Sequence, residues 1–317
     1  MITLGRTVLR VSTIGLGLAA LGRPGYINVG HGEDLGSQTD VAAMERNAHR
    51  VLEAAFAGGV RYLDAARSYG KAEAFVASWL ERRGLRLGEV TVGSKWGYTY
   101  TAGWRVDADP AEVKDLSAAR LRRQLAESRA LLGPHLRLYQ IHSATLESGV
   151  LEDRAVLEEL RRLREEGLSV GVSVTGPQQA GTIRRALEVG IFDTVQATWN
   201  LLERSSGAAL AEAHATGLGV IVKEVLANGR LTLRGGDSPL AKIARERRTT
   251  PDAVALAAVL AQPWADVALS GATTVEQLRS NLAALDLGYD EELDRQLTSL
   301  AQEPTEYWST RAALPWN

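Results

Sequence analysis

Short apolar segments alternate with longer segments of helical period along most of this 317-residue chain. A short run of apolar and β-branched residues is typical of a buried strand, and apolar residues that recur every three or four positions are typical of an amphipathic helix. The strand-like segments are residues 11–18, 61–66, 90–96, 136–142, 169–174, 194–199, 219–225 and 266–271. The helix-like segments are residues 42–57, 71–83, 118–132, 155–166, 177–189, 208–216, 251–261 and 275–284.

This alternation predicts an α/β fold. Strands that alternate with helices pair in parallel and are joined by right-handed crossovers. Eight such units predict a (β/α)8 TIM barrel that forms a single domain over residues 1–317, and a doubly wound open sheet is the second choice. Two prolines support the helix boundaries. Pro177 and Pro251 stand where a first helical turn is expected, and Thr250 precedes Pro251 as an N-cap.

Three segments do not follow the alternation. Residues 24–39 are polar and rich in glycine, and residues 97–109 are rich in aromatic side chains. Residues 288–317 form a C-terminal extension that contains Tyr307, Trp308 and Trp316. The first two segments directly follow predicted strands, so we expect them at the rim where the barrel strands end. The extension reaches the same rim if it folds back.

The composition excludes several classes of chemistry. The absence of cysteine excludes disulfides, thiolate nucleophiles, iron–sulfur clusters and cysteine-ligated zinc, and the spacing of the histidines predicts no metal site. The 36 basic and 38 acidic residues give no general attraction to nucleic acid or to an anionic membrane. No apolar stretch reaches the ~18 residues that a membrane helix needs. Glycines interrupt the apolar residues 11–22, so we do not expect a signal peptide. We therefore expect a cytoplasmic location.

Polar residues stand at the ends of several predicted strands, where parallel barrels carry their functional groups. Asp64, Lys95 and His142 end consecutive strands, and Tyr69 follows Asp64 by five residues. Adjacent strands lie about 4.8 Å apart, so Asp64 and Lys95 can form an ion pair. An ammonium beside the Tyr69 phenol is expected to lower its pKa from about 10. His142 can orient a carbonyl oxygen. Together these residues suit proton delivery during carbonyl reduction by an external hydride donor.

Further polar and aromatic residues end the later predicted strands, namely Ser173, Gln196, Trp199, Lys223 and Glu224. Together with the first four residues they carry a resemblance to the aldo-keto reductase family. The segments that resemble this family are residues 62–73, 93–97, 138–142, 171–173, 196–204 and 271–282. The resemblance extends from residue 4 to residue 285, nearly end to end.

The resemblance implies a barrel that binds a nicotinamide dinucleotide across the end where its strands finish. It implies that Tyr69 is the general acid, that Asp64 and Lys95 tune it, and that His142 orients the substrate. It further implies a cofactor site in which Ser173 and Gln196 hold the carboxamide, Trp199 stacks on the nicotinamide, and Gly271, Thr273, Gln277 and Asn281 meet the adenosine. Lys223, where this chain departs from the family pattern, is expected to reach the diphosphate or a substrate anion.

Three departures from the family pattern qualify these implications. Val174 stands where the family commonly has asparagine, which removes one carboxamide contact. Residues 271–277 contain no arginine or lysine for the 2′-phosphate of NADP. NADP is therefore the expected cofactor by family and NAD the alternative. Residues 222–229, which include Lys223 and Glu224, stand where many members have a serine–proline pair, and Lys223 can alternatively pair with Glu224 or another acid.

The aromatic residues and the ion pair have alternative readings. Trp96, Tyr98 and Trp104 either line a substrate pocket or cap the barrel. Trp199 either stacks on the cofactor or packs in the core. Asp64 and Lys95 form either a catalytic pair or a purely structural one.

The expected function is an NAD(P)-dependent oxidoreductase that acts on a small aldehyde, ketone or sugar carbonyl, or on the corresponding alcohol. The alternatives are a nicotinamide-binding regulatory subunit with slow turnover and a lyase that forms a Schiff base at Lys95. The sequence leaves the oligomeric state, the substrate and the reaction direction open.

Overall fold

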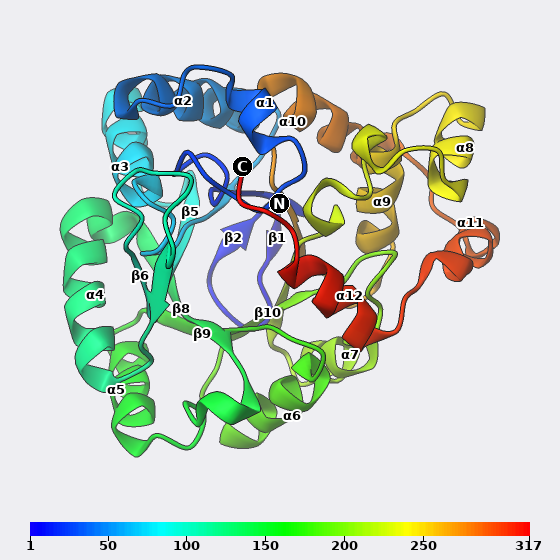
Figure 1. Cartoon of the computed structure of the whole chain (residues 1–317). Coiled ribbons are helices and arrows are strands. Elements are labelled where there is room, and N and C mark those ends of the chain that lie inside the picture. Colours follow the sequence, from blue (N-terminus) through cyan, green and yellow to red (C-terminus); the bar gives the residue numbers. More distant parts are fainter.

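Eight parallel strands close into a barrel in the computed structural model, which describes all of residues 1–317 (Figure 1). In chain order they are β3 (Ile14–Gly17), β4 (Tyr62–Asp64), β5 (Thr91–Trp96), β8 (Leu136–Ala144), β9 (Ser169–Val174), β10 (Thr194–Thr198), β11 (Gly219–Lys223) and β12 (Val267–Ser270). Each strand pairs with the next one, and β12 pairs with β3 to close the ring. The predicted (β/α)8 barrel is therefore confirmed.

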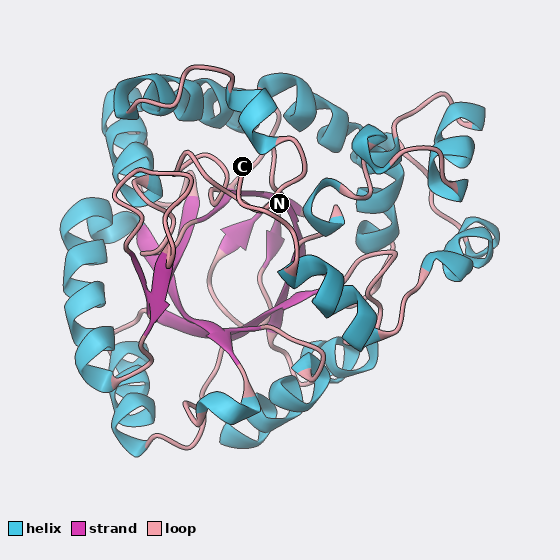
Figure 2. Cartoon of the chain, in the orientation of Figure 1, coloured by secondary structure: helices cyan, strands magenta, loops and turns pink.

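The eight helices that follow the barrel strands in the chain surround them as an outer ring (Figure 2). They are α2 (Val41–Ala57), α3 (Ala72–Arg83), α4 (Ala118–Leu132), α5 (Arg154–Glu165), α6 (Gln179–Val189), α7 (Gly207–Ala215), α9 (Pro251–Leu260) and α10 (Val275–Leu282). In α5 the buried residues Val156, Leu160 and Leu163 recur every three or four positions, which turns one apolar face toward the barrel. Asp153 caps this helix by accepting the N–H groups of Ala155 and Val156.

A small hairpin closes the end of the barrel where the strands begin. It consists of β1 (Ile2–Thr3) and β2 (Arg10–Val11), and its apolar side chains pack against the starts of the barrel strands. The single strand predicted at residues 11–18 is therefore wrong, because this segment contains both β2 and β3. The chain bends at Thr13. The hydroxyl of the preceding Ser12 donates to the carbonyl of Ile14 at 2.6 Å and accepts the N–H of Arg61 at 2.7 Å.

The two predicted helix starts have different outcomes. Thr250 caps α9 as predicted, because its hydroxyl accepts the N–H of Ala253 at 3.3 Å and Pro251 is the first helical residue. Pro177 instead stands before α6, which begins at Gln179. The side chain of Gln179 forms hydrogen bonds of 2.8 and 3.1 Å with the backbone of Thr198, so it ties α6 to β10.

The three irregular segments contain further elements. Residues 24–39 include α1 (His31–Leu35), and β6 (Tyr98–Tyr100) pairs with β7 (Glu112–Lys114) in a hairpin after β5. The C-terminal extension forms α11 (Glu291–Leu297) beside the barrel and α12 (Pro304–Ala312) at its mouth (Figure 1).

The sequence analysis did not predict α8 (Pro239–Glu246), which packs against α9 and α11. Short 3-10 turns occupy Gly133–His135, Leu146–Ser148, Ala227–Gly229, Leu233–Gly235, Ala283–Asp286 and Thr298–Leu300.

None of these helices combines the length and the hydropathy that are required to cross a membrane.

Candidate active site

A cavity of about 680 Å³ opens where the barrel strands end, and residues of all three irregular segments line it. Ten of the sequence-predicted site residues contribute to its wall: Asp64, Tyr69, Tyr98, His142, Gln196, Lys223, Gly271, Thr273, Gln277 and Asn281. Lys95 lies directly behind this wall and is fully buried. The remaining four predicted residues are elsewhere, as described below.

Lys95 connects Asp64 and Tyr69 at the inner end of the cavity. Its ammonium pairs with the carboxylate of Asp64, and it donates to the carbonyl of Ala65 at 3.0 Å and to the hydroxyl of Tyr69 at 3.4 Å. An ammonium has three protons, so all of its donors have partners. The ion pair expected from the adjacent strands β4 and β5 is thus present, and it is in contact with the phenol.

Two further donors hold the Asp64 carboxylate. The hydroxyl of Tyr62 lies 3.0 Å from Oδ1, and Nε2 of Gln196 lies 2.9 Å from the same atom. Gln196 therefore belongs to the Asp64 network through its amide nitrogen. Its Oε1 is buried and has no hydrogen-bond partner within the protein. A buried acceptor of this kind is costly unless a ligand or water satisfies it, so Gln196 Oε1 suits a donor from a bound molecule.

The pKa of Tyr69 differs from the sequence expectation. Burial raises it well above the usual value, and the negative charge of Asp64 raises it further. The prediction that Lys95 lowers the pKa of Tyr69 is wrong for the protein without a ligand, because the Lys95 ammonium is already paired with Asp64. The Arg23 guanidinium acts in the opposite direction and lowers the pKa of Tyr69. The phenol is therefore protonated and ready to donate at neutral pH.

His142 lies beside Tyr69 on the cavity wall. Its ring meets the rings of Tyr69 and Tyr98 edge to face, with centroid distances of 5.4 and 5.0 Å. Burial, and then the charges of Lys95 and Lys223, hold the pKa of His142 well below its usual value. The imidazole is therefore neutral at neutral pH and has one N–H to donate, which allows it to orient a carbonyl oxygen.

A β-bulge in β8 positions His142. The register between β8 and β9 shifts between Ile141 and Ala144, and Ser143 has a φ of +55°. The N–H of Ser143 donates to the hydroxyl of Ser173 at 2.9 Å. Ser173 is fully buried and does not line the cavity, so the structure assigns it to the bulge rather than to the predicted carboxamide contact.

None of the three predicted tryptophans reaches the cavity. Trp96 is fully buried in the core, because it follows the inward-facing Lys95 and side chains of a strand alternate between its two faces. Trp104 donates its indole N–H to the carbonyl of Thr39 at 2.6 Å and packs against Phe75. Both therefore cap or fill the barrel, and the pocket-lining prediction is corrected for them.

Trp199 also packs in the core. It is 4% exposed, and its ring meets that of Trp264 edge to face at 5.6 Å. The guanidinium of Arg204 lies 5.6 Å from the centre of the Trp199 ring. This position corresponds to the packing alternative and corrects the prediction that Trp199 stacks on a cofactor.

Lys223 faces the cavity without a carboxylate partner. It donates to the hydroxyl of Thr198 at 3.0 Å, whereas Glu224 pairs with Arg311 of α12. Burial lowers the pKa of Lys223 to about 8. Burial alone would raise the pKa of Glu224, but the charges of Arg311 and Lys223 outweigh this effect and lower it to about 2. The alternative in which Lys223 pairs directly with Glu224 is therefore corrected.

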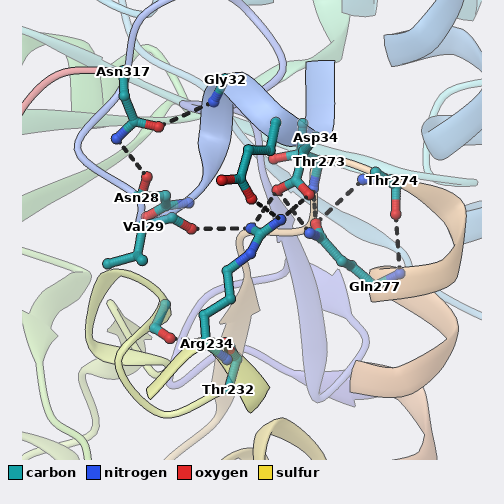
Figure 3. A network of polar contacts seen from close by, with 12 residues as sticks. Asn28, Val29, Gly32, Asp34, Thr232, Arg234, Thr273, Thr274, Gln277 and Asn317 are labelled. Carbon is teal, nitrogen blue, oxygen red and sulfur yellow. Dashed lines mark hydrogen bonds and ion pairs between the residues drawn. The ribbon is translucent and has the colours of Figure 1, made fainter. Parts of the chain in front are cut away.

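A polar network joins three segments at the other end of the cavity (Figure 3). Arg234, which follows β11, binds both oxygens of Asp34 in α1 at 2.6 and 2.8 Å. Gln277 in α10 donates to the same carboxylate at 2.8 Å and accepts the N–H of Thr273 at 2.8 Å. The side chain of Asn317 holds the adjoining loop through Gly32 and Asn28.

The cavity fits a dinucleotide that has a carboxamide at one end. Gln196 offers an unpartnered buried acceptor near Tyr69, and the first turn of α10 lines the opposite end. At Gly271 no atom lies within 4 Å of the place that a Cβ would occupy, so a ligand can approach the backbone closely. These features agree with the extended nicotinamide site that the sequence led us to expect.

The model of the Aldo/keto reductase family matches residues 13–302. The chain belongs to the aldo/keto reductase family. It is therefore an NAD(P)H-dependent oxidoreductase of a family that acts on small-molecule carbonyl substrates. A barrel of alternating strands and helices with its cavity at the strand ends is consistent with this assignment.

Individual relatives agree with the family assignment. The chain is 28% identical to an uncharacterized oxidoreductase, YrpG, of Bacillus subtilis, over 95% of both chains. It is also 28% identical to the NADH-specific methylglyoxal reductase of Escherichia coli, over 90% of this chain and 93% of that protein. The holo structure of an aldo-keto reductase from Bacillus halodurans superposes with a TM-score of 0.73 at 22% identity, over 95% and 96% of the two chains, and so supports the fold.

Sequence reasoning missed several charged residues of the cavity wall in this aldo/keto reductase. They are Arg23, Asp34, Glu112, Arg234 and Arg311. Four of them lie in or near an irregular segment and Arg234 lies in the connection after β11, where no periodic pattern relates one residue to another. The one available indication was the prediction that these segments meet at the same rim.

Proposed function

We propose that this enzyme transfers hydride between a nicotinamide cofactor and a small aldehyde, ketone or sugar carbonyl, with Tyr69 as the general acid. The observation that carries the proposal is the contact of Tyr69 with Lys95 and His142 at the inner end of the cavity. These residues provide a proton donor, a cation and a neutral hydrogen-bond donor at one place. No cysteine is present to serve as a thiolate nucleophile.

In the reduction direction, a nicotinamide cofactor would, when bound, supply the hydride that adds to the carbonyl carbon. The Tyr69 hydroxyl and the His142 N–H orient the carbonyl oxygen, on which negative charge develops. The O–H bond of Tyr69 then breaks, and its proton moves to this oxygen to give the alcohol. The phenolate is left beside the Lys95 ammonium and regains a proton from solvent. In oxidation the phenolate acts as the general base.

Several residues support cofactor binding in this proposal. Gln196 Oε1 is available to accept a hydrogen bond from the carboxamide. Lys223 provides a cation for the diphosphate or for a substrate anion. Gly271, Thr273 and Asn281 line the end proposed for the adenosine.

The charges at this end favour NADH over NADPH. Asp34, Asp252 and Glu276 contribute carboxylates to the wall, and both oxygens of Asp34 occupy the guanidinium of Arg234. A carboxylate suits a ribose hydroxyl but repels a 2′-phosphate. We therefore propose NAD(H) as the preferred cofactor, although NADP was the expectation from sequence. The name of the NADH-specific relative in Escherichia coli supports this choice.

Steady-state turnover of a carbonyl panel tests the proposed function. Methylglyoxal, benzaldehyde and glyceraldehyde are incubated with NADH or NADPH, and the wild type is compared with Tyr69→Phe. We expect measurable steady turnover in the wild type. In the variant it should fall by about a hundredfold or more, with cofactor binding retained because only the acid is removed. Near-wild-type turnover of Tyr69→Phe would contradict the proposal.

The same experiment separates the alternatives. A regulatory subunit predicts a single burst of cofactor consumption with negligible steady turnover. A Schiff-base lyase predicts a covalent adduct at Lys95 after treatment with substrate and borohydride. The proposed hydride transfer predicts neither result.

A further inference from the structure

Arg23 lies against three aromatic rings at the inner end of the cavity. The residue follows β3, lines the cavity and is only 2% exposed. The centre of its guanidinium is 5.5 Å from the ring centroid of Tyr69, 5.2 Å from that of Tyr26 and 4.5 Å from that of Trp316. A cation over an aromatic face within about 6 Å is attracted to it, more strongly where water is excluded.

Two oxygen atoms fix the orientation of this guanidinium. Nη1 of Arg23 donates to the carbonyl of Ser68 at 2.9 Å and to the carboxylate of Glu112 at 2.8 Å. Ser68 immediately precedes Tyr69, so Arg23 contacts both the backbone next to Tyr69 and the face of the Tyr69 ring. Arg23 Nε is buried without a partner, so these two bonds and the aromatic contacts are what hold the side chain.

Every irregular segment of the barrel rim contributes to this arrangement. Tyr26 comes from residues 24–39, Glu112 from the β6–β7 hairpin and Trp316 from the C-terminal extension. Segments separated by most of the chain therefore converge on one cation that contacts Tyr69. A structural anchor at the rim would not need to touch the proposed acid.

We propose that Arg23 is a positioning residue for the reaction, which holds the Tyr69 ring in place and stabilises the phenolate formed when Tyr69 gives up its proton. This inference rests on the proposed role of Tyr69. A phenolate in a buried site needs a nearby positive charge, and the Asp64 carboxylate already neutralises Lys95. Arg23 supplies a second cation near the Tyr69 ring, and its own partner Glu112 is more exposed than Asp64, with side-chain exposures of 25% and 3%.

The other charged groups around Tyr69 agree with this assignment. Burial and Asp64 raise the pKa of Tyr69, as do Glu112 and Glu224, whereas Arg23 lowers it. The titratable and charged groups that face this phenol are Tyr62 and Asp64 on β4, Lys95 on β5, Glu112 of the hairpin, His142 on β8, Glu224 after β11, and Arg23 and Tyr26 after β3. Tyr98 of the hairpin faces the neighbouring His142.

The pH dependence of alcohol oxidation tests the inference, because the rate in this direction follows the fraction of phenolate. The probes are acetol, benzyl alcohol and glycerol with NAD⁺, and the best of them is used for all variants. Without the guanidinium the phenolate is less stable, so the rising limb of kcat in Arg23→Met should move to higher pH by about one unit. This displacement corresponds to a roughly tenfold slower rate at a given pH. Arg23→Lys keeps a positive charge, so its rising limb should be displaced by less than that of Arg23→Met.

Two further variants distinguish electrostatics from loss of structure. Glu112→Gln removes the carboxylate that offsets Arg23, so its rising limb should move to lower pH, opposite to Arg23→Met. Arg61→Met is the matched control, because it removes a guanidinium that lies 3.9 Å from the ring centroid of Phe56 at the other end of the barrel. Its pH profile should superimpose on that of the wild type.

The outcomes separate this inference from the proposed function. If Tyr69→Phe is inactive while Arg23→Met and Glu112→Gln keep the wild-type pH profile, the role of Arg23 is wrong and that of Tyr69 stands. A change in KM alone would also overturn it, because Arg23 would then bind substrate. If Arg23→Met does not fold, the direction of the Glu112→Gln displacement decides. If the wild type oxidises none of the probes and reduces no carbonyl, both proposals fail.

Discussion

Arg311 in the last helix binds both carboxylate oxygens of Glu224, which directly follows the barrel strand β11, with Nε at 2.9 and 3.0 Å from them. The side chain of Glu224 is only 8% exposed, and the residue has a φ of +53°, an uncommon conformation for a residue with a side chain. Asn200 donates to the carbonyl of Glu224 and to the hydroxyl of Tyr307 in the same helix. The ion pair and these bonds fasten α12 to the mouth of the barrel.

Arg311→Met should destabilise the protein, because it leaves the Glu224 carboxylate buried without its main partner. We expect the free energy of unfolding at neutral pH to fall by about 2 kcal/mol, less than for a fully buried pair because the Arg311 side chain is 25% exposed. In the double variant Glu224→Gln with Arg311→Met the loss should be smaller, since neither charge remains. Urea unfolding measures all three proteins. Equal stability of the single and double variants would contradict a role for the ion pair.

The same pair predicts the behaviour in acid. The pKa of Glu224 in the folded protein is lowered to about 2, below its value of about 4.3 in an unfolded chain. Its contribution to stability is therefore complete above the unfolded pKa and is lost as the pH falls through the folded pKa. Urea unfolding between neutral pH and about pH 3 should show this loss in the wild type and a smaller one in Glu224→Gln.

Asp34→Asn should shift the cofactor preference toward NADPH. The substitution removes a carboxylate from the proposed adenosine end and releases Arg234, which Asp34 holds through both oxygens. We expect the ratio of the Kd values for NADPH and NADH to fall by roughly tenfold, the worth of one charged hydrogen bond. Titration of the nucleotide fluorescence measures both constants. Asp237→Asn is the control, because its carboxylate is exposed and pairs only with Arg245. If the ratio stays at the wild-type value, the 2′-position of the bound nucleotide does not lie near Asp34.

Trp199→Phe should affect stability and leave cofactor binding unchanged. The indole packs edge to face against Trp264 in the core, so the smaller ring loses contacts. The free energy of unfolding should fall by about 1–3 kcal/mol, and Trp264→Phe should behave in the same way. Urea unfolding and NADH titration measure the two effects. A weaker NADH affinity without loss of stability would restore the stacking role expected from sequence.

The sequence predicts the barrel and its inner site because both depend on local regularity. Alternating strands and helices define the fold, and the ends of successive strands bring Asp64, Lys95 and His142 to one place. The same regularity, applied to neighbouring residues, explains the failures at Trp96 and Trp199. Lys95 faces inward, so Trp96 must face the helices. Trp199 lies three positions after Gln196, which also faces inward.

The rim could not be predicted in this way, because its contacts join distant positions. Arg23 and Glu112 are 89 residues apart, Asp34 and Arg234 are 200 apart, and Glu224 and Arg311 are 87 apart. No periodic pattern connects such pairs. Their partners follow from how loops of different strands fold over a common cavity.

Lys223→Met should weaken NADH binding and remove its dependence on pH. Lys223 faces the cavity, has no carboxylate partner and has a pKa of about 8. It is therefore charged at neutral pH and loses its charge as the pH rises through that value. His142 is neutral and Glu224 is ionised throughout this range. The Kd of the anionic NADH should rise roughly tenfold between neutral pH and about pH 9 in the wild type, as the charge is lost.

In Lys223→Met the Kd should be weak and nearly constant over the same range. Lys242→Met serves as the control, because Lys242 is an exposed residue of α8 that does not line the cavity. Fluorescence titration at a series of pH values, at constant ionic strength, measures all three proteins. A wild-type Kd that is independent of pH would mean that Lys223 does not meet the cofactor anion. A dependence on pH that persists in Lys223→Met would assign the effect to another group.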